Sequence, residues 1–270
     1  MPRPGLPRLI ATDLDGTLVR SDDTVSAYTH EVLDRVRAAG IRIVGATGRG
    51  PRLSELTRSD IKAADFLVLA HGGWVFDVTD PQPLRSSRLA GAALSTLLDD
   101  LEDSVGPLTV MVEALEHPGA PLWGTRTPDW RYEVVVEERT RSSCLEGDVI
   151  KAYACSSSHD VDDLLAAARL VIPPHVASVT QAGLNVIEIC PPDVDKGTGL
   201  AVVAEAVGVD PADVLVFGDM PNDLPMFAWA GWHRVAVANA HPTVLAAADE
   251  VTLANDDDGV AVYLDRLMSR

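Results

Sequence analysis

Short runs of β-branched and aliphatic residues lie near both ends of the chain and predict buried strands. The runs are Leu9 to Thr12, Ile41 to Ala46, Phe66 to Ala70 and Val214 to Phe217. Unbroken apolar runs of this length are typical of strands covered on both faces, as in a parallel sheet. Apolar residues at helical spacing predict the helices between them, at Ser26 to Ala39, Arg52 to Lys62 and Gly199 to Val207. Strands that alternate with helices predict an α/β fold with a doubly wound, Rossmann-like parallel sheet.

The middle third of the chain has a different pattern, in which strand-like runs follow one another with fewer helices between them. Loops rich in Pro, Gly, Trp and Arg separate these runs. The pattern predicts helices at Ala90 to Asp103 and Val161 to Leu170, and strands at Leu108 to Glu113, Glu133 to Val136, Val149 to Cys155, Ala177 to Thr180 and Val186 to Cys190. We therefore expect an inserted α+β domain over 83–190, and a core built from 1–82 and 191–270.

The composition and charge restrict the class of partner. With 270 residues and 47% apolar content, the chain can build a sizeable core. It carries 40 acidic and 22 basic residues, a formal charge of −18. This balance argues against a nucleic-acid or anionic-membrane partner, because both need a basic face. An anionic substrate would also need a cation, or well-placed Lys and Thr groups, at its site.

The cysteines and the N-terminus indicate a cytoplasmic protein. Cys144, Cys155 and Cys190 are too few and too irregularly spaced for a disulfide framework or a zinc site, which fits a reducing compartment. The start, MPRPGLPRLIATDLDG, passes into a strand-like run without the apolar stretch of a signal peptide. No segment approaches the ~18 apolar residues of a membrane span. The sequence gives no indication of the oligomeric state.

Polar residues with catalytic potential follow the predicted strands of the core. They are Asp13-Leu14-Asp15-Gly16-Thr17, Thr47-Gly48-Arg49, Lys196-Gly197 at a helix start, and Gly218-Asp219-Met220-Pro221-Asn222-Asp223. Each alone has a structural explanation as a turn or a helix cap. Ligand sites in open α/β sheets lie beyond the carboxyl ends of the strands, so together these residues predict one shared crevice.

Such a crevice is suited to phosphoryl transfer. A carboxylate can attack phosphorus and form an aspartyl-phosphate, while a second carboxyl supplies and removes a proton. Asp13 and Asp219 offer oxygen ligands for Mg²⁺. Lys196, the Thr47 hydroxyl and the backbone N–H groups of Leu14 to Gly16 can hold the phosphate. The residues themselves leave open whether Asp13 or Asp15 is the nucleophile.

The chain resembles the haloacid dehalogenase superfamily of phosphatases, in the Cof-type branch with a large inserted cap. Asp13-x-Asp15-Gly-Thr resembles the first motif of that family, Thr47-Gly-Arg the second, Lys196 the third, and Gly218-Asp219-x-x-Asn222-Asp223 the fourth. The stretches VIEICPPDVDKGTGL and VAVANAHPTVLAAADEVTLANDDDGVAVYL resemble the flanking segments of this branch.

The resemblance implies roles for individual residues. It makes Asp13 the nucleophile and Asp15 the general acid/base, and it implies that the backbone carbonyl of Asp15 also binds Mg²⁺. It makes Asp219 a direct metal ligand and lets Asp223 bind the metal directly or through water. It further implies that Thr47, Gly48, Lys196 and Asn222 hold the phosphate, and that Lys196 pairs with Asp13.

Two features depart from the family pattern or lie outside it. His71-Gly72-Gly73 stands where this branch has Asn-Gly, so His71 either closes the strand end or contacts substrate. In the inserted domain, aromatic and Arg residues are clustered and could contact substrate or pack cap to core. These residues are Trp123, Arg126, Trp130, Arg131 and Tyr132.

We therefore expect a Mg²⁺-dependent phosphatase of small phosphorylated metabolites, and the resemblance favours sugar phosphates. A phosphomutase is the first alternative, because the same Asp pair could pass phosphate to a second hydroxyl. It would need a second basic cluster in the cap, for which Arg126 and Arg131 are candidates. A signalling module that accepts phosphate without turnover is the second alternative. Asp15 argues against it, because such a module needs no acid for a leaving alkoxide.

Overall fold

The computed structural model describes residues 5–80, 82–127, 130, 134–181 and 185–269. The chain divides into two compact units. The first contains Met1–Gly48, Glu55–Arg85 and Asp195–Arg270, and the second contains Arg49–Ser54 and Ser86–Val194. Residues 49–54, which the sequence expectation places with the core, belong to the second unit. There the Arg52 carbonyl accepts a hydrogen bond from the Gly119 N–H at 2.9 Å, and the Arg52 N–H donates to Glu113 Oε1 at 3.1 Å.

The first unit is built on a mainly parallel sheet whose strand order is β14-β13-β12-β1-β2-β3-β4-β5. Its strands are β1 (Leu9–Thr12), β2 (Arg42–Ala46), β3 (Phe66–Leu69), β4 (Trp74–Asp77), β5 (Pro83–Ser86), β12 (Val214–Gly218), β13 (His233–Ala236) and β14 (Glu250–Val251). Pairing is parallel from β14 through to β3 and antiparallel between β3 and β4. This arrangement is the predicted doubly wound α/β fold.

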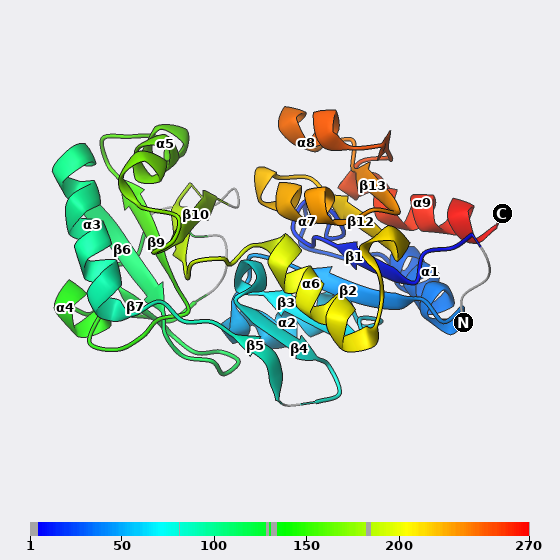
Figure 1. Cartoon of the computed structure of the whole chain (residues 1–270), viewed down its shortest axis with the longest axis horizontal. Coiled ribbons are helices and arrows are strands. Elements are labelled where there is room, and N and C mark those ends of the chain that lie inside the picture. The colour runs from blue at the N-terminus through cyan, green and yellow to red at the C-terminus, as the bar shows by residue number, and fades with distance from the viewer. Residues whose placement is uncertain (1–4, 81, 128–129, 131–133, 182–184, 270) are drawn as a thin grey trace. The chain divides into compact units, whose positions relative to one another are not determined.

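Helices flank this sheet. They are α1 (Ala27–Ala38), α2 (Ser54–Asp60), α6 (Lys196–Val207), α7 (Leu224–Trp229), α8 (Pro242–Ala247) and α9 (Gly259–Met268), with short 3₁₀ turns η2 (Ala70–Gly72), η3 (Pro211–Asp213), η4 (Pro221–Asp223) and η5 (Asn255–Asp257). A further 3₁₀ turn, η1 (Pro51–Leu53), belongs to the second unit. α6 packs on α7, and α1 packs on α9. Figure 1 shows α6 on the viewer's side of the sheet. Every residue of β1 and β3 is buried, which explains their unbroken apolar sequence.

The antiparallel strand β4 was not expected from the sequence, which predicted a strand continuing through Ala70. The strand instead ends at Leu69, and the chain reverses through η2. Ala70 and His71 have φ values of 49° and 57°, in the left-handed region, and Gly72 has a φ of 105°. This tight reversal brings β4 back beside β3, a hairpin that an apolar pattern alone does not reveal.

The second unit is an antiparallel-rich sheet with the strand order β10-β11-β9-β6-β7-β8 and its own helices. Its elements are β6 (Leu108–Glu113), β7 (Leu122–Gly124), β8 (Val136–Glu137), β9 (Lys151–Ser156), β10 (Ser178–Gln181), β11 (Ile187–Cys190), α3 (Gly91–Val105), α4 (Arg141–Cys144) and α5 (Val161–Val171). α3 packs on α5, and α5 contacts β9, β10 and β11. Alternate residues of the strands face these helices, as the predicted α+β pattern requires.

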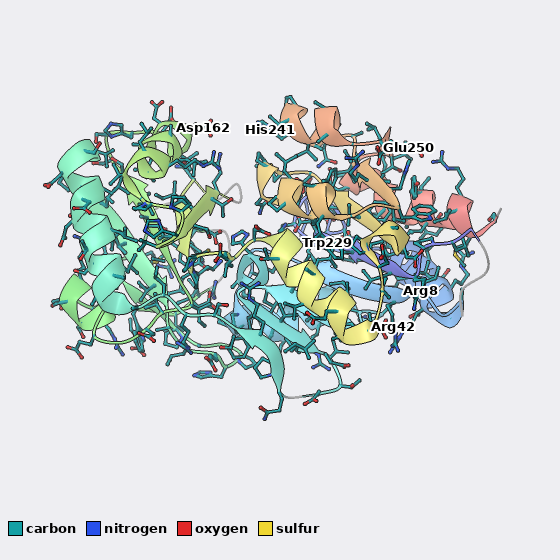
Figure 2. All side chains as sticks on the ribbon, viewed as in Figure 1. Arg8, Arg42, Asp162, Trp229, His241 and Glu250 are labelled. Carbon is teal, nitrogen blue, oxygen red and sulfur yellow. The ribbon has the colours of Figure 1, made fainter. Side chains whose placement is uncertain are left out.

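Charged side chains on the first unit form ion pairs at its surface. Arg42 and Glu250, both labelled in Figure 2, pair with Asp65 and Arg266 respectively. The Glu250–Arg266 pair is exposed on both sides and contributes little to stability, because water and salt screen it. Among the residues that the structure describes, no helix combines the length and the apolar character needed to cross a membrane.

Candidate active site

The carboxylates of the site follow two neighbouring strands of the core sheet. Asp13 comes directly after β1, and Asp219 comes directly after β12. These strands are parallel neighbours, and the Asp13 N–H continues their pairing by donating to the Phe217 carbonyl at 3.0 Å. Parallel strands deliver their carboxyl ends to one edge of the sheet. The two side chains therefore meet, although 206 positions separate them in the chain.

Lys196 joins two of the carboxylates. Its Nζ donates to Asp13 Oδ1 and to Asp223 Oδ1, at 2.6 Å in each case, and its side chain is fully buried. The lysine is held by a capping box at the start of α6. Asp195 accepts the Thr198 N–H at 2.7 Å, and the Thr198 hydroxyl accepts the Asp195 N–H at 3.2 Å. The helix start thus sets the direction from which the ammonium approaches.

The turn after β1 packs tightly against Asp219. The Thr17 hydroxyl donates to Asp219 Oδ1 at 2.7 Å. Gly16 has a φ of 86°, and a Cβ there would lie 2.6 Å from Asp219 Oδ2, so only glycine fits. The sequence had suggested Thr17 only as a turn residue. Its contact with a carboxylate 202 positions away depends on the fold, and no local signal in the sequence could reveal it.

Asp223 organises the turn that carries Asp219. Its Oδ2 accepts the backbone N–H groups of Asp219 and Met220 at 2.9 and 3.0 Å, while its Oδ1 faces Lys196. The neighbouring Asn222 is buried, and among the described residues its Oδ1 has no hydrogen-bond partner. An unsatisfied buried oxygen is costly, so this amide is a candidate for contact with a bound group.

Three buried carboxyl groups lie close to one ammonium group, and this shifts the pKa values of the site. Burial raises the pKa of Asp13 well above its usual value, and the Lys196 charge only partly opposes this effect. Burial, followed by the charge of Asp223, raises the pKa of Asp219 to about 6. Burial alone would lower the pKa of Lys196, but Asp13 and Asp223 raise it above its usual value. The lysine is therefore charged at neutral pH.

The donor set fits a small hard cation. Asp13, Asp219 and Asp223 each present an oxygen within 4.8 Å of the others, and all three residues are buried. Three carboxylates facing one ammonium leave negative charge that a divalent cation would neutralise. Oxygen ligands are those that Mg²⁺ prefers. Both oxygens of Asp223 already accept hydrogen bonds. Asp13 and Asp219 accept fewer, so their oxygens are more available to a cation.

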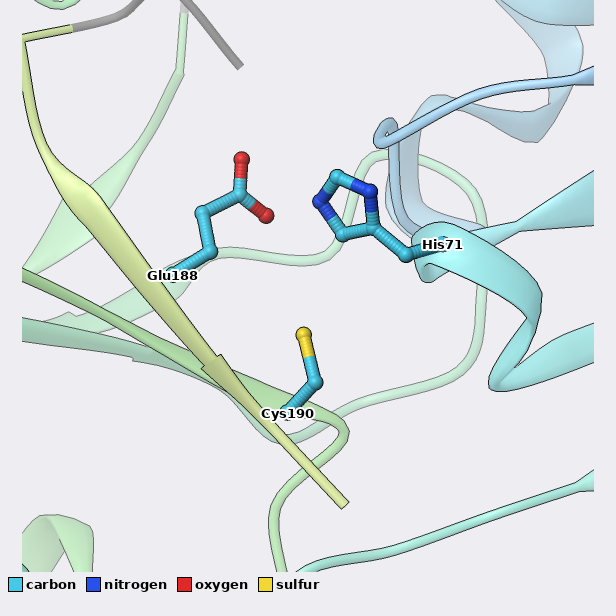
Figure 3. A group of neighbouring side chains, drawn as sticks. All are labelled: His71, Glu188 and Cys190. Carbon is cyan, nitrogen blue, oxygen red and sulfur yellow. The ribbon is translucent and has the colours of Figure 1, made fainter. Parts of the chain in front are cut away.

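Thr47, Gly48 and His71 lie together at the ends of β2 and β3. Thr47 is buried, and its carbonyl accepts the His71 N–H at 3.1 Å. The imidazole packs against Gly48, where a Cβ would lie 2.7 Å from the ring Cε1. His71 projects from η2 (Figure 3). The histidine packs at the ends of both strands, and its two proposed explanations, closing the strand end or contacting substrate, both stay predictions.

Of the candidate contacts in the second unit, Arg131 and Tyr132 lie outside the described residues. Arg126 is exposed and donates to the Val134 carbonyl at 2.8 Å. The Trp130 and Tyr153 rings pack in a T-shaped arrangement at a centroid distance of 4.8 Å. On this unit, β11 presents Glu188 and Cys190 from one face (Figure 3). Lys151 forms a buried ion pair with Glu188 at 2.6 Å, which the sequence did not suggest.

The carboxylates and the lysine at the strand ends suit phosphoryl transfer, and comparison with known proteins shows a family of hydrolases. The model of the haloacid dehalogenase-like hydrolases matches residues 10–264. A 5-amino-6-(5-phospho-D-ribitylamino)uracil phosphatase of Bacillus subtilis is 29% identical, with 97% of this chain and 98% of that protein covered. A phosphoglycolate phosphatase of Haloarcula marismortui is 32% identical, with 95% and 97% covered. The crystal structure of a subclass IIB sugar phosphatase matches the fold at a TM-score of 0.79 and 20% identity, with 97% and 99% covered.

The chain belongs to the haloacid dehalogenase-like hydrolases, and within them to the Cof-type phosphatases. It is accordingly a phosphoric monoester hydrolase, as the motif resemblance predicted. The family match spans both ends of the core sheet and the whole of the second unit.

Proposed function

We propose that this enzyme hydrolyses small phosphorylated metabolites through an aspartyl-phosphate on Asp13, with Mg²⁺ as cofactor. The observation that carries the proposal is the buried cluster of Asp13, Lys196, Asp219 and Asp223. A phosphate monoester bears negative charge, and this acidic chain can accept it only where a cation and fixed donors neutralise the site.

Asp13 and Asp219 would hold the cation, together with the backbone carbonyl of Asp15. Asp223 would hold it directly or through water. Bound Mg²⁺ would supply charge neutralisation for the phosphoryl oxygens. Lys196, with Thr47, Gly48 and Asn222, would hold the transferring group from the protein side.

The reaction then divides between two carboxyls. An Asp13 oxygen attacks phosphorus, and the bond from phosphorus to the substrate oxygen breaks while Asp15 donates a proton to that oxygen. Asp15, now a carboxylate, takes a proton from water as the water attacks the phosphorus of the aspartyl-phosphate. Phosphate leaves, and both carboxyls return to their starting states. Asp15 is half-exposed, in keeping with a group that must exchange protons with substrate and water.

The substrate class rests on chemistry and on the relatives. Two relatives are named for phosphatase action on small molecules, one a phosphoribityl compound and the other phosphoglycolate. We favour sugar phosphates and assign substrate selection to the second unit. Arg126, Trp130 and Arg131 are the proposed contacts there, with His71 from the core.

A phosphate-release screen tests the proposal. The protein is incubated with Mg²⁺ and a panel of sugar, polyol and carboxylic-acid phosphates, and free phosphate is followed. We expect release from at least one class. Mass analysis of the organic product separates hydrolysis from transfer to a second hydroxyl, as a mutase would perform. Stable phosphorylation of the protein without release would favour the signalling alternative, and no release across the panel would refute the proposed function.

A further inference from the structure

A segment near the C-terminus, residues 239–258, forms hydrogen bonds to the turn that follows β1. The Asn239 Nδ2 donates to the Gly16 carbonyl at 2.8 Å, and the buried Asn255 Nδ2 donates to the Val19 carbonyl at 3.0 Å. The two amides are joined, because Asn239 Oδ1 accepts the Asn255 N–H at 2.9 Å. None of these groups belongs to the proposed reaction.

The same segment continues to hold the chain beyond the turn. Asp258 pairs with the Arg20 guanidinium through two hydrogen bonds, at 2.5 and 3.1 Å. Asp256 accepts both the N–H and the hydroxyl of Ser21, at 2.8 and 3.0 Å. The acidic run 256–258 therefore anchors this loop.

The two amides hold residues that closely follow Asp15 in the chain. One holds the carbonyl of the next residue, Gly16, and the other holds Val19, which forms an isolated β-bridge with Asp15. The other side of the turn is packed against Asp219, which leaves no room at Gly16. Movement of the turn away from Asp219 is thus opposed by Asn239 and Asn255. Their loss would release the backbone that carries the Asp15 carboxyl.

We propose that Asn239 and Asn255 are positioning residues that hold the Asp15 turn in place for proton transfer to the leaving group. The inference rests on the proposed function of Asp15. It predicts a specific kinetic signature, because only substrates with a poor leaving group need a proton from the enzyme. A displaced acid harms their cleavage, whereas an activated aryl ester is cleaved without it.

The experiment compares Asn239→Ala with wild type on two substrates. One is the alkyl phosphate that wild type cleaves fastest, and the other is 2,4-dinitrophenyl phosphate. The measured quantity is kcat/KM, which reports the steps up to formation of the aspartyl-phosphate, whichever step limits turnover. General acids contribute about 10²–10⁴-fold, so we expect the loss in kcat/KM for the alkyl ester to exceed that for the aryl ester by roughly tenfold or more. Asn239 is exposed, so the variant should fold.

Asn255→Ala should show the same split, and Thr252→Val is the matched control. The Thr252 hydroxyl donates to the Gly259 carbonyl at 2.8 Å, in the same segment but away from the turn. We expect its loss, if any, to be equal for both substrates. Equal losses in Asn239→Ala, or no loss, would overturn the inference while leaving the proposed function intact. Failure of wild type to cleave either ester would instead overturn the proposed function, and the inference with it.

Discussion

Replacing Lys196 by methionine removes the ammonium that separates the carboxylates of the site. The fully buried Nζ lies 2.6 Å from oxygens of both Asp13 and Asp223. Methionine keeps much of the volume but leaves these acids facing each other and Asp219. Removing one partner of a buried ion pair costs about 3–5 kcal/mol, because the remaining charge is not compensated. At about 2–4 °C per kcal/mol, the melting temperature in EDTA should fall by roughly 6–20 °C.

Mg²⁺ should restore part of this loss in Lys196→Met. A cation that binds only the folded state stabilises it, and it would meet three carboxylates without a competing ammonium. We therefore expect the rise in melting temperature on replacing EDTA by Mg²⁺ to exceed that of wild type. Thermal unfolding followed by circular dichroism measures both quantities.

Lys151→Met is the matched control, because Lys151 is also a buried lysine paired with a carboxylate, Glu188, at 2.6 Å. It should lose comparable stability, yet Mg²⁺ should raise its melting temperature no more than that of wild type. An equal Mg²⁺ effect in Lys196→Met, Lys151→Met and wild type would refute the placement of the cation beside Lys196.

Further outcomes follow from individual contacts. Asp13→Asn should abolish turnover while circular dichroism stays that of wild type, since it removes the nucleophile without changing its shape; residual phosphate release would contradict this role. EDTA should stop phosphate release and added Mg²⁺ should restore it, so activity that survives chelation would exclude the proposed cofactor. Thr17→Val removes a hydrogen bond to a carboxylate oxygen of Asp219 and should lower the free energy of unfolding by about 1.5–3 kcal/mol, as urea unfolding can measure. The Arg141 hydrogen bonds lower the pKa of Glu102, so Glu102→Gln should lower the free energy of unfolding by less than about 1 kcal/mol at pH 7. Urea unfolding should show that this difference disappears as the pH falls through the lowered pKa, where Glu102 takes up its proton.

The core strands were predictable because the signal for a buried strand, an unbroken apolar run, lies in neighbouring residues. β1 is observed at Leu9–Thr12 as expected, and β12 differs from its prediction only by including Gly218. Both are buried on two faces, so their apolar residues form unbroken runs. The short strand β7 and the C-terminal helix α9 were missed. β7 covers only Leu122–Gly124, too few residues to show a period, and α9 lies in a stretch that the pattern analysis did not divide into elements.

Periodicity and motif spacing are properties of neighbouring residues, so the amino-acid sequence predicts the α/β class, the inserted middle region and the set of polar residues at the strand ends. Which of these residues meet is set by the fold of the whole chain. Thr17 reaches Asp219, Lys196 bridges Asp13 and Asp223, and Asn239 holds Gly16. Each contact depends on the order and direction of strands that are distant in the chain. That order follows from packing a whole sheet, so no local pattern contains it.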